Sequence, residues 1–158
     1  MIRQGRGAEA VSISRKALEM SDKTGPGYNS ARAAGTIALA TSDPDERRWA
    51  LQTGERYLSQ GSVGHNHLLF YPDAIDVMLS EGDWDQAERY AAALEDFTRP
   101  EPRPWSDFFI ARGRALATWG RGRREPELVA ELQRLRSEAE RLSLTTALPA
   151  LDQALKAA

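Results

Sequence analysis

Residues 82–98 read GDWDQAERYAAALEDFT, and this stretch decides the predicted fold. Asp83 lies three residues before Gln86, which is the spacing at which an acidic side chain caps the start of an α-helix. Steps of three and four residues indicate one face of a helix rather than a strand. The apolar positions follow such steps: Trp84, Ala87, Tyr90, Ala91, Leu94 and Phe97. The stretch therefore predicts an amphipathic helix that needs an apolar partner.

Similar helix-capping and turn-forming residues recur along the chain at intervals of about 40 residues. Asp43, Asp83 and the turn at 120–122 each join an aromatic-rich or Ala-rich segment to a second amphipathic segment. Asp43 is followed by Pro44 and Glu46, an arrangement like a capping box. Leu and Ala also far outnumber Val and Ile, which favours helices. The sequence thus predicts stacked helical hairpins.

The turn-forming residues divide the chain into segments of helical length and predict about eight antiparallel helices in one all-α domain that spans residues 1–158. The helices are expected over 7–22, 27–41, 44–60, 64–80, 84–98, 104–119, 125–142 and 147–157. The helix over 7–22 has no partner within a hairpin, and the hairpins cover 27–60, 64–98 and 104–142. The helix over 147–157 caps the stack, because a terminal repeat must hide its apolar face. Pro72 predicts a kink or a restart near Tyr71.

One helix carries a second possible pattern. Its apolar residues follow a 4-3-4-3 spacing: Leu128, Leu132, Leu135, Ala139 and Leu142. This spacing fits a coiled-coil seam, but it covers only about two heptads where three or four are usual. The second helix of a hairpin is the favoured interpretation.

Composition excludes several function classes. Lys and Arg number 21 against 23 Asp and Glu, so the net charge of −2 disfavours a general nucleic-acid binder. The absence of Cys excludes disulfides and thiolate chemistry. No apolar run approaches the roughly 20 residues of a membrane span, and residues 1–5 lack the apolar core of a signal peptide. A cytoplasmic protein with no membrane partner is expected.

The sequence offers no set of residues for catalysis or metal binding. His65 and His67 are the only imidazoles, and side chains two residues apart on a helix point about 200° away from each other. Both could hold one ion only from a strand or a loop. Ser106 precedes Asp107, but no base can be assigned to activate its hydroxyl. We predict no catalytic residue, no metal, no cofactor and no enzymatic activity.

Charge is distributed unevenly across the middle of the chain. One segment holds only basic residues among its charged positions: Arg112, Arg114, Arg121, Arg123 and Arg124. An earlier group is mostly acidic: Asp83, Asp85, Glu88, Glu95 and Asp96, with Arg89 among them. This pattern fits either a site for an anion or an acidic peptide, or neighbouring helices that neutralise each other.

A family resemblance emerges from longer stretches. They are Gly64-His65-Asn66-His67-Leu68, Gly82-Asp83-Trp84-Asp85-Gln86-Ala87-Glu88-Arg89-Tyr90, Leu94-Glu95-Asp96 and Pro104-Trp105-Ser106-Asp107-Phe108-Phe109-Ile110-Ala111-Arg112-Gly113. Together these stretches resemble the tetratricopeptide-like C-terminal region of multidomain bacterial proteins that join a class III adenylate or guanylate cyclase to an ATPase. The resemblance covers a little over half of the chain well. It implies a right-handed superhelix that acts as a regulatory or scaffolding tail.

The resemblance transfers no chemistry. None of the metal-binding, base-selecting or transition-state residues of the cyclase domain has a counterpart here. The segment Gly120-Arg121-Gly122-Arg123-Arg124 lacks the Gly-Lys-Ser/Thr ending of a phosphate-binding loop.

We therefore expect a helical-repeat module that binds another protein or itself, as a homodimer for example. An alternative is a sensory module that binds a small anionic ligand near residues 112–124. In a repeat of this kind the first helix of each hairpin lines the groove, which gives seven candidate contact residues: Asn29, Arg32, Asn66, Asp73, Asp107, Arg112 and Arg114.

Overall fold

The computed structural model describes residues 7–25 and 27–157, and all the regular elements in that part of the chain are α-helices. There are eight, and helices adjacent in the chain pack antiparallel. Their bounds are α1 Gly7–Thr24, α2 Ser30–Ala40, α3 Pro44–Ser59, α4 His65–Glu81, α5 Trp84–Thr98, α6 Pro104–Gly120, α7 Pro126–Arg141 and α8 Leu148–Lys156. The predicted all-α class and helix order are confirmed.

The helices form two compact units. Unit 1 ends at Val77 and unit 2 begins at Met78, so the chain passes from one unit to the other within α4. The single domain over residues 1–158 and its superhelical form stay predictions.

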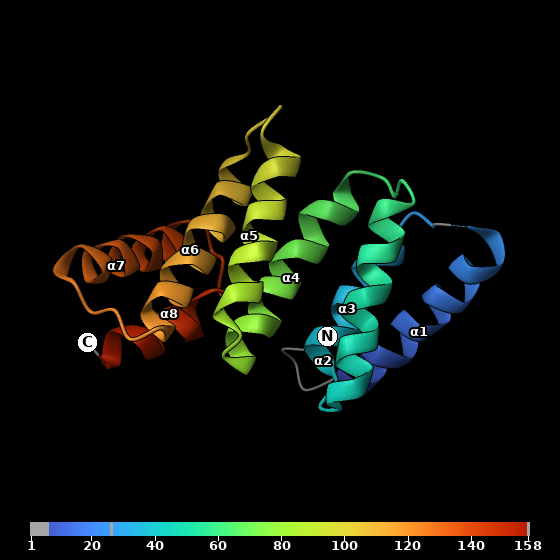
Figure 1. Cartoon of the computed structure of the whole chain (residues 1–158), viewed down its shortest axis with the longest axis horizontal. Coiled ribbons are helices and arrows are strands. Elements are labelled where there is room, and N and C mark those ends of the chain that lie inside the picture. Colours follow the sequence, from blue (N-terminus) through green and yellow to red (C-terminus); the bar gives the residue numbers. More distant parts are fainter. Residues whose placement is uncertain (1–6, 26, 158) are drawn as a thin grey trace. The chain divides into compact units, whose positions relative to one another are not determined.

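In unit 1, α2 is the central helix. It packs against α1 on one side and α3 on another, as the blue and cyan coils of Figure 1 show. α2 is rich in alanine, and Ala31, Ala34 and Ala38 have no exposed surface. From α4, the fully buried ring of Phe70 reaches Gly35 of α2 and Gly54 of α3. Small residues therefore allow these helices to approach one another closely.

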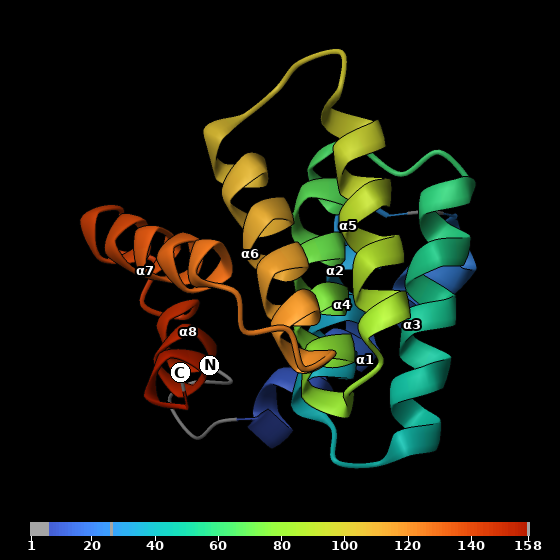
Figure 2. The ribbon, with the colours of Figure 1, turned by 60° about the vertical axis from the view of Figure 1, so that its left-hand side comes forward.

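In unit 2, α6 is the central helix. It packs against α5, α7 and α8, and α7 also packs against α8; in Figure 2, α5 is the yellow-green coil and α6, α7 and α8 are the gold, orange and red coils. The core includes Leu94 of α5, Leu132 and Leu135 of α7, and Leu151 of α8, all with no exposed surface. α8 packs against α6 and α7, and its role as the cap of a helical stack stays a prediction.

Two predicted helix starts are confirmed by hydrogen bonds. The Asp43 carboxylate accepts from the amides of Asp45 and Glu46, at 2.9 and 3.4 Å. The Asp83 carboxylate accepts from the amide of Gln86 at 3.1 Å. Both acids satisfy amides that have no partner within the helix.

Two expectations about helix bounds need correction. α2 begins at Ser30 rather than at residue 27, because the side chain of Asn66 binds the Tyr28 carbonyl at 2.8 Å and holds this segment in a turn. α4 runs without a restart through Pro72. Pro72 is buried, and packing around the ring offsets the lost backbone hydrogen bond. The expectation about a signal core in residues 1–5 falls outside the described residues.

The α7 helix behaves as a hairpin helix. Leu132, Leu135 and Ala139 are fully buried against the neighbouring helices, whereas Leu142 at the end of the pattern is 40% exposed. Among the described residues, no helix is long and apolar enough to cross a bilayer.

Candidate interaction surface

The seven residues predicted to line a groove divide between the two units. Asn29, Arg32, Asn66 and Asp73 belong to unit 1, and Asp107, Arg112 and Arg114 belong to unit 2. Asn66 and Arg112 are buried, with 0% and 2% of their surface exposed, and the structure places both in the interior rather than on a contact surface.

Asn66 joins two loops of unit 1 from within. Its Oδ1 accepts from the amide of Arg32 at 3.1 Å. Its Nδ2 donates to the carbonyls of Tyr28 and Val63, at 2.8 and 3.2 Å. One buried amide thus fixes the loop before α2, the start of α2 and the loop before α4. Asn66 is a structural residue, because its donors and its acceptor are used inside the fold.

The Asn66 hydrogen bonds hold four neighbouring side chains at the surface, which we name the Tyr28 strip: Tyr28, Asn29, Arg32 and His65. The Tyr28 ring is 68% exposed and lies against the His65 ring, with centroids 4.2 Å apart. His65 Nε2 is 3.2 Å from Asn29 Oδ1. Arg32 lies in the first turn of α2, three residues after the N-cap residue Asn29. Tyr28, Asn29 and Arg32 are exposed and His65 is half-buried, and all four belong to unit 1.

The remaining candidates of unit 1 and unit 2 differ in exposure. Asp73 is half-buried on α4, and its carboxylate lies 3.2 Å from the position that a Cβ on Gly35 would take. Asp107 is exposed in the first turn of α6.

Arg112 occupies a position in the buried stripe of α6. Its Nε donates to the carbonyl of Ala147 at 3.2 Å, and Ala147 is the residue that precedes α8. The guanidinium therefore ties the start of α8 to α6. A buried cation that binds a carbonyl stabilises this packing and offers no group to a partner.

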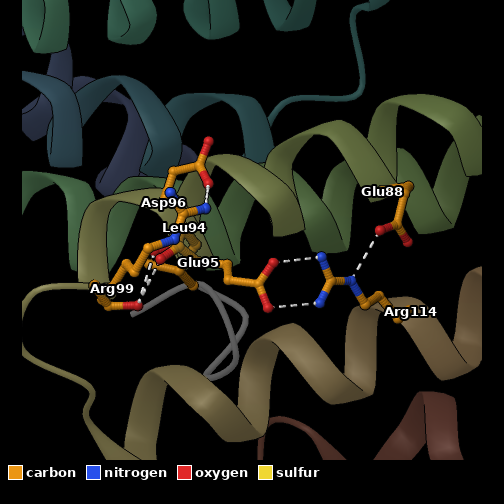
Figure 3. A network of polar contacts seen from close by, with 7 residues as sticks. Glu88, Leu94, Glu95, Asp96, Arg99 and Arg114 are labelled. Carbon is orange, nitrogen blue, oxygen red and sulfur yellow. Dashed lines mark hydrogen bonds and ion pairs between the residues drawn. The ribbon is translucent and has the colours of Figure 1, made fainter.

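Arg114 lies between two glutamates of α5, as Figure 3 shows. Its Nη1 and Nη2 bind both carboxylate oxygens of Glu95, at 3.0 and 2.9 Å, and its Nε binds Glu88 at 2.8 Å. The hydrogen bonds to Glu95 raise the pKa of the guanidinium, and those from Arg114 lower the pKa of Glu95. This network links α6 to α5 within unit 2.

The other arginines of the basic segment also have partners close by. Arg121 binds Asp85 of α5 at 2.6 Å, and Arg123 binds Glu125 at 2.5 Å. Arg124 lies over the Trp119 ring, 3.6 Å from its centroid, and donates to the Trp119 carbonyl. These contacts favour the interpretation that the charged helices neutralise each other, and they leave little to recruit a small anion near residues 112–124.

The two histidines have different surroundings. His65 takes part in the Tyr28 strip, whereas burial lowers the pKa of His67, whose ring lies 5.8 Å from that of Tyr71. Among the described residues, no three His, Asp or Glu side chains gather in a group that could hold a metal ion.

Sequence reasoning missed Tyr28, the most exposed aromatic residue of the described chain. Tyr28 fell inside the expected helix over 27–41, whereas the structure has it in the turn before α2, where no helix face buries its ring.

Comparison with protein-family models, with curated proteins and with solved structures yields no match to this chain.

Proposed function

We propose that this chain is a non-enzymatic, tetratricopeptide-like helical-repeat module that binds another protein or a second copy of itself, as the tail of a larger signalling protein would. The observation that carries the proposal is the antiparallel packing of helices that are adjacent in the chain. Such an array exposes whole helix faces and loop ends, which is how repeat proteins bind their partners.

The distribution of apolar surface supports a binding role. Among the residues that the structure describes, seven large apolar side chains are more than a third exposed, and five of them belong to unit 1: Ile13, Met20, Tyr28, Trp49 and Val63. Exposed aromatic side chains are typical anchors of protein interfaces. Unit 1 is therefore the part of the chain that we expect to contact a partner.

The charged residues support the same role for a different reason. In unit 2 the arginines of α6 and of the loop that follows it are bound to acids, carbonyls or a ring of the same unit. Contacts of this kind stabilise a scaffold, and they do not form the convergent array of nucleophile, base and orienting group that catalysis needs.

The test is affinity capture with the purified full chain as bait in a lysate of the source cell. The matched control bait is Ile37→Asp, which places a charge at a fully buried position of α2 and is expected to unfold unit 1. A protein retained by the native bait and lost with the control is then purified, and its affinity is measured by calorimetry. Light scattering of the chain alone tests self-association.

The outcomes are distinct. Direct binding of a purified partner, or a concentration-dependent dimer, supports the module. If both baits retain the same proteins and the chain stays monomeric, the proposed function is wrong.

A further inference from the structure

The Tyr28 strip presents hydrogen-bond donors on a backbone segment that the buried side chain of Asn66 holds in place. Asn66 binds the carbonyl of Tyr28 and the amide of Arg32, so the backbone on both sides of Asn29 is anchored. Groups held in place before binding lose less conformational entropy when a partner docks. The strip is thus better suited to recognition than a set of mobile surface side chains.

The hydrogen bond between His65 and Asn29 determines which groups of the strip face outward. Asn29 Oδ1 can only accept, so His65 Nε2 is the donor in this contact. The Asn29 amide nitrogen keeps its two N–H donors, and it makes no side-chain cap hydrogen bond with α2. The outward polar group of Asn29 is therefore a donor.

Arg32 adds a cationic donor to the strip. Its side chain is exposed, and it forms no ion pair with any described residue. A guanidinium carries five N–H donors in a planar fork that fits a carboxylate. On α4, the carboxylate of Asp73 lies beside Gly35, and Gly35 follows Arg32 on α2 by about one helical turn.

The lack of an ion pair within the described residues distinguishes Arg32 from several arginines of unit 2. Arg114 and Arg121 bind glutamate or aspartate on α5, and Arg136 binds Asp152. A carboxylate that approached those arginines would have to displace an internal acid. At Arg32 it would meet no such competitor.

We propose that the Tyr28 strip binds an acidic peptide segment of another protein, in which a carboxylate lies beside an apolar side chain. The carboxylate accepts from Arg32 and Asn29, and the apolar side chain packs on the paired rings of Tyr28 and His65. The inference rests on the proposed function and adds to it a surface and the chemistry of the partner.

The test uses the full chain and short labelled peptides in which a central leucine is flanked by glutamates, with glutamines in the matched peptide. Fluorescence anisotropy gives the affinity, and amide chemical shifts give the site. We expect the glutamate peptide to bind about tenfold more tightly than the glutamine peptide. Its shift changes are expected in residues 28–32 and 63–67.

Two variants locate the contacts. Arg32→Glu is expected to weaken peptide binding by about tenfold or more, and Tyr28→Ala by about tenfold. Tyr28→Ala retains the backbone carbonyl that Asn66 binds, so the fold is preserved. The control is Arg48→Glu, an exposed arginine of α3 in the same unit, which is expected to leave binding unchanged.

The inference is overturned if the glutamate peptide does not bind, if Arg32→Glu and Arg48→Glu affect binding equally, or if inorganic phosphate competes as well as the peptide does. A protein partner that binds the native chain and the Arg32→Glu variant equally would leave the proposed function intact and would reject the Tyr28 strip as its surface.

Discussion

The ring of Phe70 occupies the space that a side chain on Gly54 would need. A Cβ built on Gly54 would lie 2.1 Å from Phe70 Cε2, well inside van der Waals contact. Gly54 lies within α3, and Phe70 lies on α4 with no exposed surface. The absence of a side chain at residue 54 is what lets this ring pack against α3.

Gly54→Ala is therefore expected to destabilise the protein. The added methyl must displace a fully buried ring, and overpacking of this kind costs about 1–3 kcal/mol despite the better helix propensity of alanine. Urea denaturation of the native chain and the variant measures the difference. The control is Gly7→Ala, whose methyl would meet only the Ala40 carbonyl at 3.8 Å. Equal stabilities of the two variants would contradict the close contact.

Much of the fold could be predicted because its signals are local. The Asp43 and Asp83 caps depend on spacings of two and three residues, and the apolar faces of α5 and α6 depend on steps of three and four. These interactions need no knowledge of distant parts of the chain. The α2 start was missed for the opposite reason, because the side chain of Asn66, 38 residues after Tyr28, holds Tyr28 outside the helix.

The candidate site was harder to predict because exposure depends on tertiary contacts. Arg112 and Arg114 are two residues apart in one basic segment, yet one is buried against Ala147 and the other spans two acids of α5. A clue to the burial of Arg112 was present, since it is the one charged member of an otherwise apolar stripe that includes Phe109 and Leu116. Nothing local pairs Arg114 with Glu95, nineteen residues away.

Asn66 and Ser106 are both buried polar residues, and we expect opposite effects from changing them to alanine. Asn66→Ala leaves the Tyr28 carbonyl and the Arg32 amide without this partner and removes one of two hydrogen bonds to the Val63 carbonyl, so a loss of about 2–4 kcal/mol is expected. Ser106 has no exposed surface, and its hydroxyl has no hydrogen-bond partner among the described residues. Ser106→Ala is expected to be neutral or to stabilise by up to about 1 kcal/mol.

Thermal unfolding followed by circular dichroism gives both values. A destabilising Ser106→Ala would mean that its hydroxyl binds water or another group in the folded state. A neutral Asn66→Ala would show that the loops before α2 and α4 do not depend on this amide.

Arg114→Glu is expected to weaken unit 2 without unfolding it. The change replaces a cation that binds Glu88 and Glu95 with a third carboxylate, but the Arg114 side chain is 35% exposed and solvent screens the repulsion. We expect a loss of about 1–2 kcal/mol in urea denaturation, which becomes smaller in high salt. Arg99→Glu is the matched control, because its ion pair with Asp96 is more exposed and links residues of one helix end. Complete unfolding of Arg114→Glu would assign this network a larger structural role.

Stability at low pH is expected to depend on Glu46. The Thr41 hydroxyl donates to its carboxylate at 2.5 Å and Arg15 binds its other oxygen, and these contacts lower the pKa of Glu46 below the ordinary 4.5. A carboxyl with a lower pKa in the folded state contributes stability that is present above the unfolded pKa and is lost as pH falls through the folded pKa.

The free energy of unfolding should therefore decrease as pH falls from the ordinary carboxyl pKa through the lower folded pKa of Glu46, and part of this decrease is due to Glu46. Glu46→Gln is expected to flatten the profile in this window, because its amide does not titrate. The measurement is urea denaturation at a series of pH values for the native chain, Glu46→Gln and the control Glu127→Gln, which changes an exposed residue of the α7 first turn. If Glu127→Gln flattens the profile as much as Glu46→Gln does, the acid sensitivity arises from overall charge rather than from the contacts of Glu46 with Thr41 and Arg15.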